Sequence, residues 1–197
     1  MCHSLFLPNP SNNFNLNTKF FQTDTKEQWD QNRTKFGPGW IYYSQDIDYK
    51  FNDNGFRMNK KIAEVDQDQY LLFLGCSNTL GIGLRLEDTY SYRVSKTLDL
   101  DYINLGVGGA SPEYVLTLLT KYLQTCHKNP AAIIINWPSI FRTFFYDNQD
   151  NLIFKFPLAN NNLFVHTYKE FMLHKNNREN KFLTITEIVK LLTKSKG

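Results

Sequence analysis

The 197-residue chain has few cysteines and prolines, three and seven respectively, and no long hydrophobic run. The odd cysteine count and the lack of any CxxC spacing argue against a disulfide framework or a zinc site, so we expect no metal. No apolar stretch approaches the ~18 residues that a membrane-spanning helix needs. The first residues lack a basic segment and an adequate apolar core. We therefore expect no signal peptide and a reducing, cytoplasmic location.

Charge is also sparse, since charged residues make up 21% of the chain and the net charge is only +3. The positive surplus lies near the C-terminus, where seven Lys or Arg stand against three Glu over residues 169–196. A basic tail could bind nucleic acid or acidic lipid. The spacing is more typical of a solvated helix face, and we expect neither nucleic acid nor a membrane as partner.

The amino-acid composition and patterning of the chain change near residue 69. Residues 1–68 are polar, Asn-rich and aromatic, without clean periodicity, which predicts an irregular segment packed on a larger domain. Residues 69–197 contain the periodic elements and are expected to form that domain. The total length suits one domain with extensions.

Three short, continuous apolar runs predict buried strands at residues 70–74, 101–105 and 131–135. Helical patterns lie between them, at residues 88–98 and from 111 to about 127. Alternating strands and helices within so short a stretch predict an α/β fold with a parallel sheet. Ligands of such sheets bind at the carboxyl ends of the strands.

The C-terminal third continues this pattern only in part. Residues 143–181 are Asn-rich and predict an insertion or a lid. A capping box at Thr184–Glu187 predicts the start of a final helix, with an apolar stripe over Ile185–Leu192 and a stop at Gly197. No further strand follows this helix, so we expect the C-terminal part of the sheet to be missing and the chain to be truncated.

Glycines gather where the predicted chemistry lies, since six of the ten fall between residues 75 and 109. The segment Gly75–Gly81 places Ser77 just after a buried strand, where backbone N–H groups could receive an oxyanion. It lacks the Gly-Lys-Ser/Thr of a phosphate-binding loop and the G-x-G-x-x-G spacing. Thr79 also excludes a G-x-S-x-G elbow. The plainer alternative is that Ser77 is an ordinary N-cap hydroxyl.

Two segments resemble a known family. Gly75–Gly81 (GCSNTLG) is similar to the first block, G-D-S-x-T-x-G, of the SGNH (GDSL-type) hydrolases, and Asn104–Gly109 (NLGVGG) is similar to their second block, N-x-G-x-x-G. The resemblance covers roughly residues 49–142. It implies a flavodoxin-like three-layer α/β/α fold and the hydrolysis of esters or acyl groups without a cofactor.

The resemblance also implies roles for particular residues. Ser77 would be the nucleophile, and the backbone N–H groups of Ser77 and Gly109 would form the oxyanion hole. Cys76 replaces the Asp that usually precedes the serine. The third block, G-x-N-D, is not found after the third strand, where Asn136 or Ser139 remains as a candidate third donor.

Two arginines are candidates for contacts with a small-molecule, glycan or lipid ester. Arg57 follows a turn signal upstream of the serine block, and the alternative is an ordinary surface arginine. Arg142 follows the third predicted strand, where it could contact an acidic substrate group or a carboxylate within the fold.

The expected catalytic base is missing. In the family it lies in a D-x-x-H motif near the C-terminus, and no Asp stands three residues before His127, His166 or His174. A serine without a base is a weak nucleophile. The chain is therefore truncated, uses another base, or is a non-catalytic binding module that recognises a glycan or an acylated partner. A nucleotide-binding protein is a further alternative, which the missing lysine and the glycine spacing disfavour.

Overall fold

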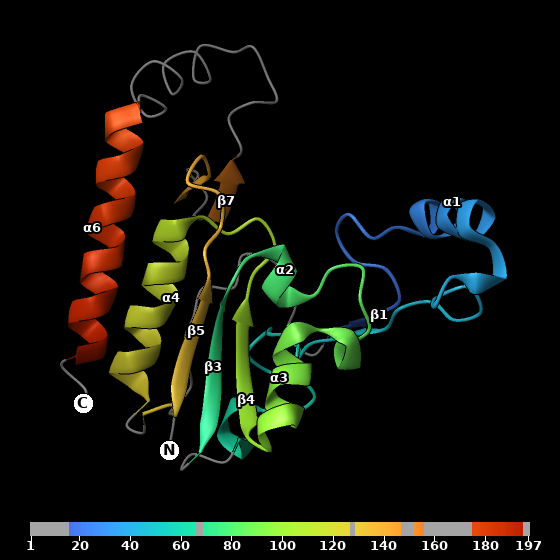
Figure 1. Ribbon diagram of the computed structural model, residues 1–197, viewed down its shortest axis with the longest axis horizontal. Helices are drawn as coiled ribbons and strands as arrows, with labels where there is room; N and C mark the ends of the chain where they lie inside the picture. The colour runs from blue at the N-terminus through green and yellow to red at the C-terminus, as the bar shows by residue number, and fades with distance from the viewer. Residues whose placement is uncertain (1–15, 66–68, 127–128, 147–151, 156–174, 195–197) are drawn as a thin grey trace.

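The computed structural model describes residues 16–65, 69–126, 129–146, 152–155 and 175–194 (Figure 1). Its centre is a three-stranded parallel sheet of order β4-β3-β5. Two short antiparallel pairs, β1-β2 and β6-β7, lie outside this sheet. The mixed α/β class and the parallel sheet are therefore confirmed.

Strand β3 (Tyr70–Gly75) is the middle strand, flanked by β4 (Asp101–Gly106) and β5 (Ala132–Asn136). All six residues of β3 are buried, which explains its continuous apolar run. Each of the three strands begins and ends within one residue of the predicted position. The apolar runs thus located the sheet correctly.

Helices α3 (Tyr90–Leu98) and α4 (Pro112–Thr125) connect these strands. The side chain of Ser111 caps α4, as the sequence predicted. Helix α3 begins slightly later than predicted, because a 3-10 turn occupies Leu86–Asp88 and Thr89 then caps the helix. The predicted helices are confirmed, with these shifts at their ends.

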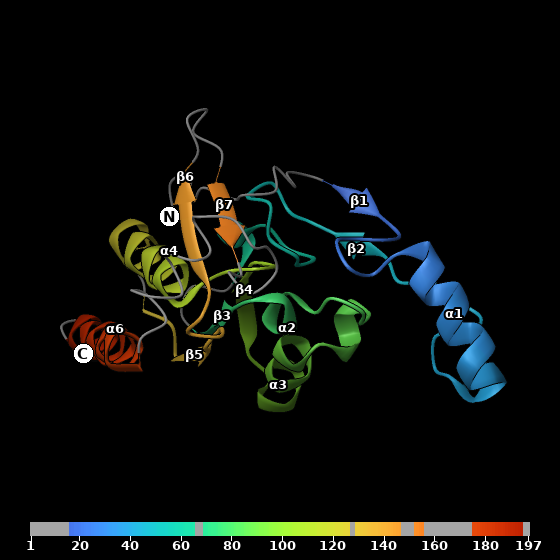
Figure 2. The same ribbon diagram turned by 90° about the horizontal axis from the view of Figure 1, so that it is seen from above.

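Helices α3 and α4 lie on different sides of the strands β3, β4 and β5 (Figure 2). Alternate side chains of a strand point to opposite faces. Leu72 and Leu74 of β3 join the main core with α4, whereas the Phe73 ring lies edge-on to Tyr90 of α3, with centroids 5.5 Å apart. Helix α4 contributes six residues to the main core, namely Tyr114, Val115, Leu118, Leu119, Tyr122 and Leu123.

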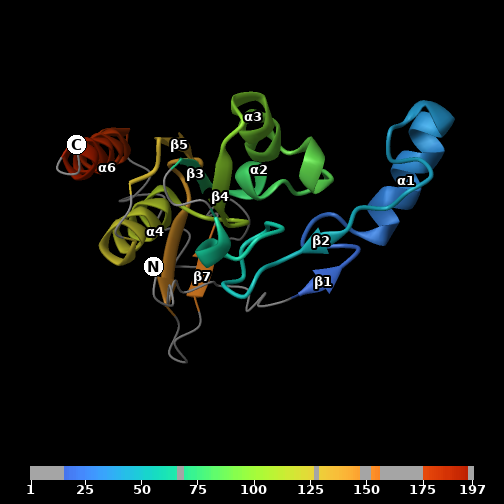
Figure 3. The ribbon, with the colours of Figure 1, turned by 90° about the horizontal axis from the view of Figure 1, so that it is seen from below.

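The N-terminal segment has its own small core. Strand β1 (Asn17–Thr18) pairs with β2 (Tyr49–Lys50), and helix α1 (Lys26–Phe36) lies far from the sheet (Figure 3). Short 3-10 turns occupy Gly37–Gly39 and Ile62–Glu64. Helix α1 has no buried residue and a mostly polar sequence, which is why no periodicity predicted it. The small core contains five buried residues, namely Tyr42, Ile47, Tyr49, Phe51 and Leu80.

The insertion or lid expected at residues 143–181 stays a prediction, but the structure places secondary structure in its described parts. Strands β6 (Thr143–Tyr146) and β7 (Leu152–Lys155) form an antiparallel pair. Helix α6 (Lys175–Lys194) already covers residues 175–181 and packs beside α4 (Figure 1). Because this segment is rich in Asn, neither the strand pair nor the first turns of α6 were predicted from the sequence.

The predicted start of the last helix is wrong, because Thr184–Glu187 lies inside α6. The turns of α6 before Thr184 are stabilised by tertiary contacts, because the Lys181 side chain forms an ion pair with Glu113 of α4. The apolar stripe is confirmed in part: Val189 and Leu192 pack on the main core and Ile185 is buried, whereas Ile188 and Leu191 are 38% and 67% exposed. Gly197 lies outside the described residues. Among the helices that are described, none combines the length and apolarity of a membrane span.

The cysteines differ from expectation. Cys76 is free and buried, whereas Cys126 is disulfide-bonded. The expectation of no disulfide is therefore wrong for Cys126. Cysteine usage no longer supports a reducing compartment, and the cytoplasmic location stays a prediction.

We predict that Leu118→Ala lowers the free energy of unfolding by about 2–5 kcal/mol, because Leu118 is fully buried between α4 and the sheet. Leu98→Ala is the matched control, since Leu98 is 55% exposed, and it should cost about 0.5 kcal/mol or less. Urea unfolding followed by circular dichroism measures both. Equal losses for the two variants would contradict the assigned core.

Candidate functional site

The three parallel strands end at the same level. Gly75 of β3 is in register with Gly106 of β4 on one side and with Asn136 of β5 on the other. The Val107 N–H donates to the Gly75 carbonyl over 3.1 Å, which ties together the segments that follow β3 and β4. The structure therefore brings the two glycine-containing segments to one edge of the sheet, the edge where ligands of parallel sheets bind.

Ser77 is the first residue of α2 (Ser77–Leu80), a single helical turn closed by Gly81 at φ 81°. The residue is half-buried. Its hydroxyl lies 3.9 Å from the Cys76 sulfur and caps no helical N–H, so the N-cap interpretation of Ser77 is wrong. Such a contact with sulfur is weak, which leaves the hydroxyl available to a ligand.

Glycine is required where α2 meets the strands. A Cβ on Gly75 would lie 2.7 Å from the Asn136 carbonyl oxygen and would overlap the Thr79 side chain. A Cβ on Gly106 would lie 2.7 Å from the Thr79 carbonyl carbon. Distances this short are excluded for real side chains. The two glycines therefore let α2 rest directly on the strand ends and fix the height of Ser77 above the sheet.

Asn104 completes this attachment from inside β4. Its buried side-chain amide donates to the Thr79 carbonyl over 2.8 Å and accepts from the Gly106 N–H over 2.9 Å. It also reaches the Ser91 hydroxyl at 3.2 Å. The sequence marked Asn104 only as part of a motif, and the structure shows that it joins β4 to α2.

The loop after β4 carries Gly109 at φ 82°, a conformation that glycine adopts without strain. The Ala110 N–H donates to the Val107 carbonyl over 3.1 Å and closes the loop. The amide of Gln22, from the N-terminal segment, lies against the Cα of Gly108, where a Cβ would otherwise be. Sequence reasoning missed Gln22, because nothing in its neighbourhood resembles a motif.

Neither candidate for a third oxyanion donor is shown beside Ser77. The Asn136 side chain lies near the Tyr90 hydroxyl, which is 2.9 Å from the Thr79 hydroxyl. Burial raises the pKa of Tyr90 above its usual value. Ser139 is exposed and stabilises a turn, in which its carbonyl accepts from the Arg142 N–H over 3.0 Å. The role of both residues stays a prediction.

Arg57 is not a surface residue, since it is only 1% exposed. Its terminal nitrogens donate to four backbone carbonyls, those of Asp48, Leu80, Gly81 and Leu84. Its guanidinium lies over the Tyr49 ring, 4.1 Å from the centroid. Burial lowers the pKa of Arg57 from its usual value. This geometry favours a structural role, in which Arg57 joins the loop after α2 to the N-terminal segment, over a contact with substrate.

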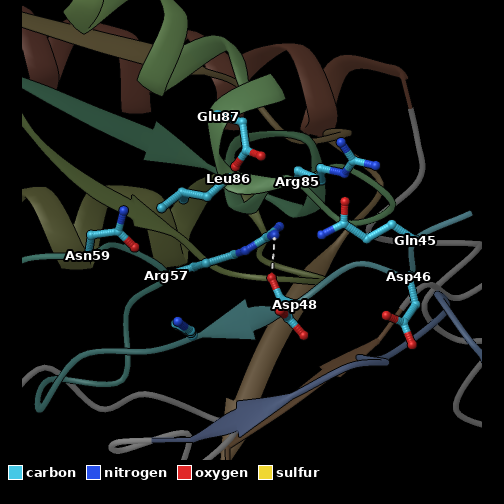
Figure 4. Close-up of a pocket in the computed structure, with 9 residues that line it drawn as sticks. Gln45, Asp46, Asp48, Arg57, Asn59, Arg85, Leu86 and Glu87 are labelled. Atoms are coloured by element: carbon cyan, nitrogen blue, oxygen red, sulfur yellow. Dashed lines mark hydrogen bonds between the residues drawn. The ribbon is translucent and has the colours of Figure 1, made fainter. Parts of the chain in front are cut away.

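A polar cavity of about 230 Å³ lies beside Arg57 (Figure 4). The side chains of Gln45 and Glu87 lie around the Arg57 guanidinium in this view. The cavity is lined by Gln45, Asp46, Asp48, Lys50, Arg57, Asn59, Arg85, Leu86 and Glu87. None of these belongs to the Ser77 or Gly109 segments. Because three acidic and three basic residues line it, the cavity favours neither an anion nor a cation.

Arg142 is half-buried, and its Nη1 is buried without a hydrogen-bond partner. The nearby carboxylate of Glu113 pairs with Lys181, and Lys181 also donates to the Arg142 carbonyl over 3.4 Å. The nearby carboxylate within the fold, that of Glu113, is thus paired with Lys181. A contact between Arg142 and an acidic substrate group stays a prediction.

The catalytic base is not located by the structure, because all four histidines lie outside the described residues. Within the described ranges, no imidazole or carboxylate is hydrogen-bonded to the Ser77 hydroxyl, and no group of three metal-ligating side chains is found. A search for similar proteins matched no family model, no curated protein and no solved structure. The interpretation of the site therefore rests on its own geometry and on the two sequence blocks.

We predict that Arg57→Met lowers the free energy of unfolding by about 3 kcal/mol, because it leaves buried carbonyls without donors. Arg93→Met is the matched control, since the Arg93 side chain is 67% exposed in its pair with Asp88. Its cost should stay within about 1 kcal/mol. Guanidinium unfolding monitored by tryptophan fluorescence compares the two. A loss at Arg57 no larger than that at Arg93 would rule out the structural role.

Proposed function

We propose that the chain is a serine-dependent hydrolase that acts on an ester or acyl group of a small molecule, a carbohydrate or a lipid. The observation that carries the proposal is the position of Ser77. It is half-buried at the carboxyl edge of the sheet, its hydroxyl is unused by the neighbouring backbone, and the Gly109 loop is tied to the same edge. In this proposal the fold is the flavodoxin-like three-layer α/β/α arrangement, with α3 and α4 flanking the sheet.

The proposed reaction is acyl transfer. The Ser77 oxygen attacks the carbonyl carbon and forms a covalent bond, while the carbonyl oxygen gains negative charge. The backbone N–H groups of Ser77 and Gly109 stabilise that charge, and such preorganised donors are each worth ~10²–10³ in rate. The serine proton passes through a base to the departing alcohol, and water then releases the acid. No cofactor or metal takes part in these steps.

The proposal assigns the catalytic base to no described residue. A serine hydroxyl needs a proton acceptor to become an effective nucleophile. We place this acceptor outside the described residues, because no described carboxylate or imidazole is bonded to Ser77. Arg142 remains the candidate for a contact with an acidic group on the substrate.

The same observation favours one second function. If no base reaches Ser77, the site is a non-catalytic binding module that keeps the cleft and recognises a glycan or an acylated partner. The two functions differ in whether the Ser77 oxygen reacts.

We predict that a fluorophosphonate probe labels the full-length natural product of the gene and that Ser77→Ala abolishes the labelling. The probe reacts only with an activated serine, so labelling reports both the nucleophile and its base. Ser44→Ala is the matched control, since Ser44 lies exposed in the N-terminal segment, and it should label like the wild type. In-gel fluorescence and intact mass measure the labelled fraction.

Circular dichroism confirms that each variant is folded. A folded wild-type protein that takes up no probe contradicts the hydrolase and supports the binding module. Labelling that persists in Ser77→Ala would move the nucleophile to another residue.

A further inference from the structure

Gln22 has a backbone conformation that glutamine rarely adopts, with φ 54°. The left-handed region costs residues other than glycine roughly 1–2 kcal/mol. Within the described ranges only one other non-glycine residue shares it, and that residue, Asp99, closes helix α3. Gln22 ends no helix. Strain that persists in a native structure must be held by its surroundings.

The turn that contains Gln22 is fixed at both ends. The Phe21 N–H donates to the Asp24 carbonyl over 3.0 Å, and the Asp24 N–H donates back over 3.1 Å. The Phe21 ring packs 4.8 Å from that of Phe51. The hydroxyl of the buried Tyr49 donates to the Asp24 carboxylate over 2.6 Å. The small N-terminal core thus holds the strained turn in place.

The turn presents the Gln22 amide to the loop that carries Gly109. The three atoms nearest to a Cβ built on Gly108 all belong to the Gln22 amide, and they would overlap it. Gly108 does not have a positive φ, so its backbone would accept an alanine. An alanine at Gly108 would therefore require the end of the Gln22 side chain to move.

We propose that Gln22 is a further substrate-contacting residue of the site, whose side-chain amide donates a hydrogen bond to the acyl carbonyl oxygen. This inference rests on the proposed hydrolase function. The amide adjoins the residue before Gly109, and Gln22 is solvent-exposed, so a ligand can reach it. Asparagine and glutamine amides serve as oxyanion donors in acyl transfer. The other amide at this edge, that of Asn136, lies near the Tyr90 hydroxyl.

The strain gives this role a signature that a structural role lacks. Gln22→Gly removes the amide and also relieves the strained conformation. We expect this variant to have a higher Tm than the wild type but a kcat about 10²-fold lower for p-nitrophenyl butyrate. Gln22→Glu keeps the shape and loses the donor, so its kcat should fall to a similar extent with KM changed less than threefold. Gln69→Glu, at an exposed glutamine before β3, is the charge-matched control.

A third variant tests the contact itself. Gly108→Ala would push the Gln22 amide out of position without altering it. We expect Gly108→Ala to lower kcat as Gln22→Gly does, and the double variant to lose no more than either single variant. Additive losses would show that the two residues act independently and would overturn the inference.

The outcomes separate this inference from the proposed function. If Ser77→Ala abolishes hydrolysis while Gln22→Gly and Gln22→Glu keep wild-type kcat, the hydrolase stands and the role of Gln22 is wrong. A lower Tm with unchanged kcat in Gln22→Gly would also overturn it, because that result describes a structural turn. If the folded wild-type protein neither hydrolyses the ester nor labels at Ser77, the proposed function fails and the inference fails with it.

Discussion

The close approach of a single helical turn to the ends of two strands is the constraint on which the rest of the site depends. Helix α2 can rest on β3 and β4 only because Gly75 and Gly106 have no side chains there. Asn104 then satisfies the Thr79 carbonyl at the contact. This attachment sets the position of Ser77 before any ligand arrives, and preorganisation of this kind is what acyl transfer requires.

A second attachment joins the N-terminal segment to the same turn. Tyr49 is its centre: its hydroxyl donates to Asp24 and accepts from the Gly83 N–H, while its ring lies beneath Arg57. Arg57 in turn binds the carbonyls that follow α2, including that of Leu84 at 2.7 Å. The segment that looked irregular in the sequence thus supports the site from the side opposite the sheet.

The sequence predicted the parts of the fold that depend on local signals. The apolar run of β3 and the Ser111 cap of α4 are local, and both are confirmed. The start of α6 was missed because Lys181 is held by a residue of another helix, and tertiary contacts override a local capping pattern. For the site, the sequence placed Ser77 and Gly109 at the same edge of the sheet, because each segment directly follows a predicted parallel strand. The burial of Arg57 and the placement of Gln22 depend on contacts between distant segments, which no local pattern encodes.

Helix α2 belongs to both hydrophobic cores, because Cys76 at its start is part of the main core and Leu80 at its end is part of the small one. Cores of different size open with different free energies. The smaller core therefore limits the temperature and the denaturant concentration at which the site stays folded. Mild heat or denaturant should unfold the end of α2 while the sheet is still intact. The site is then lost in a local unfolding event that changes the helix and strand content very little.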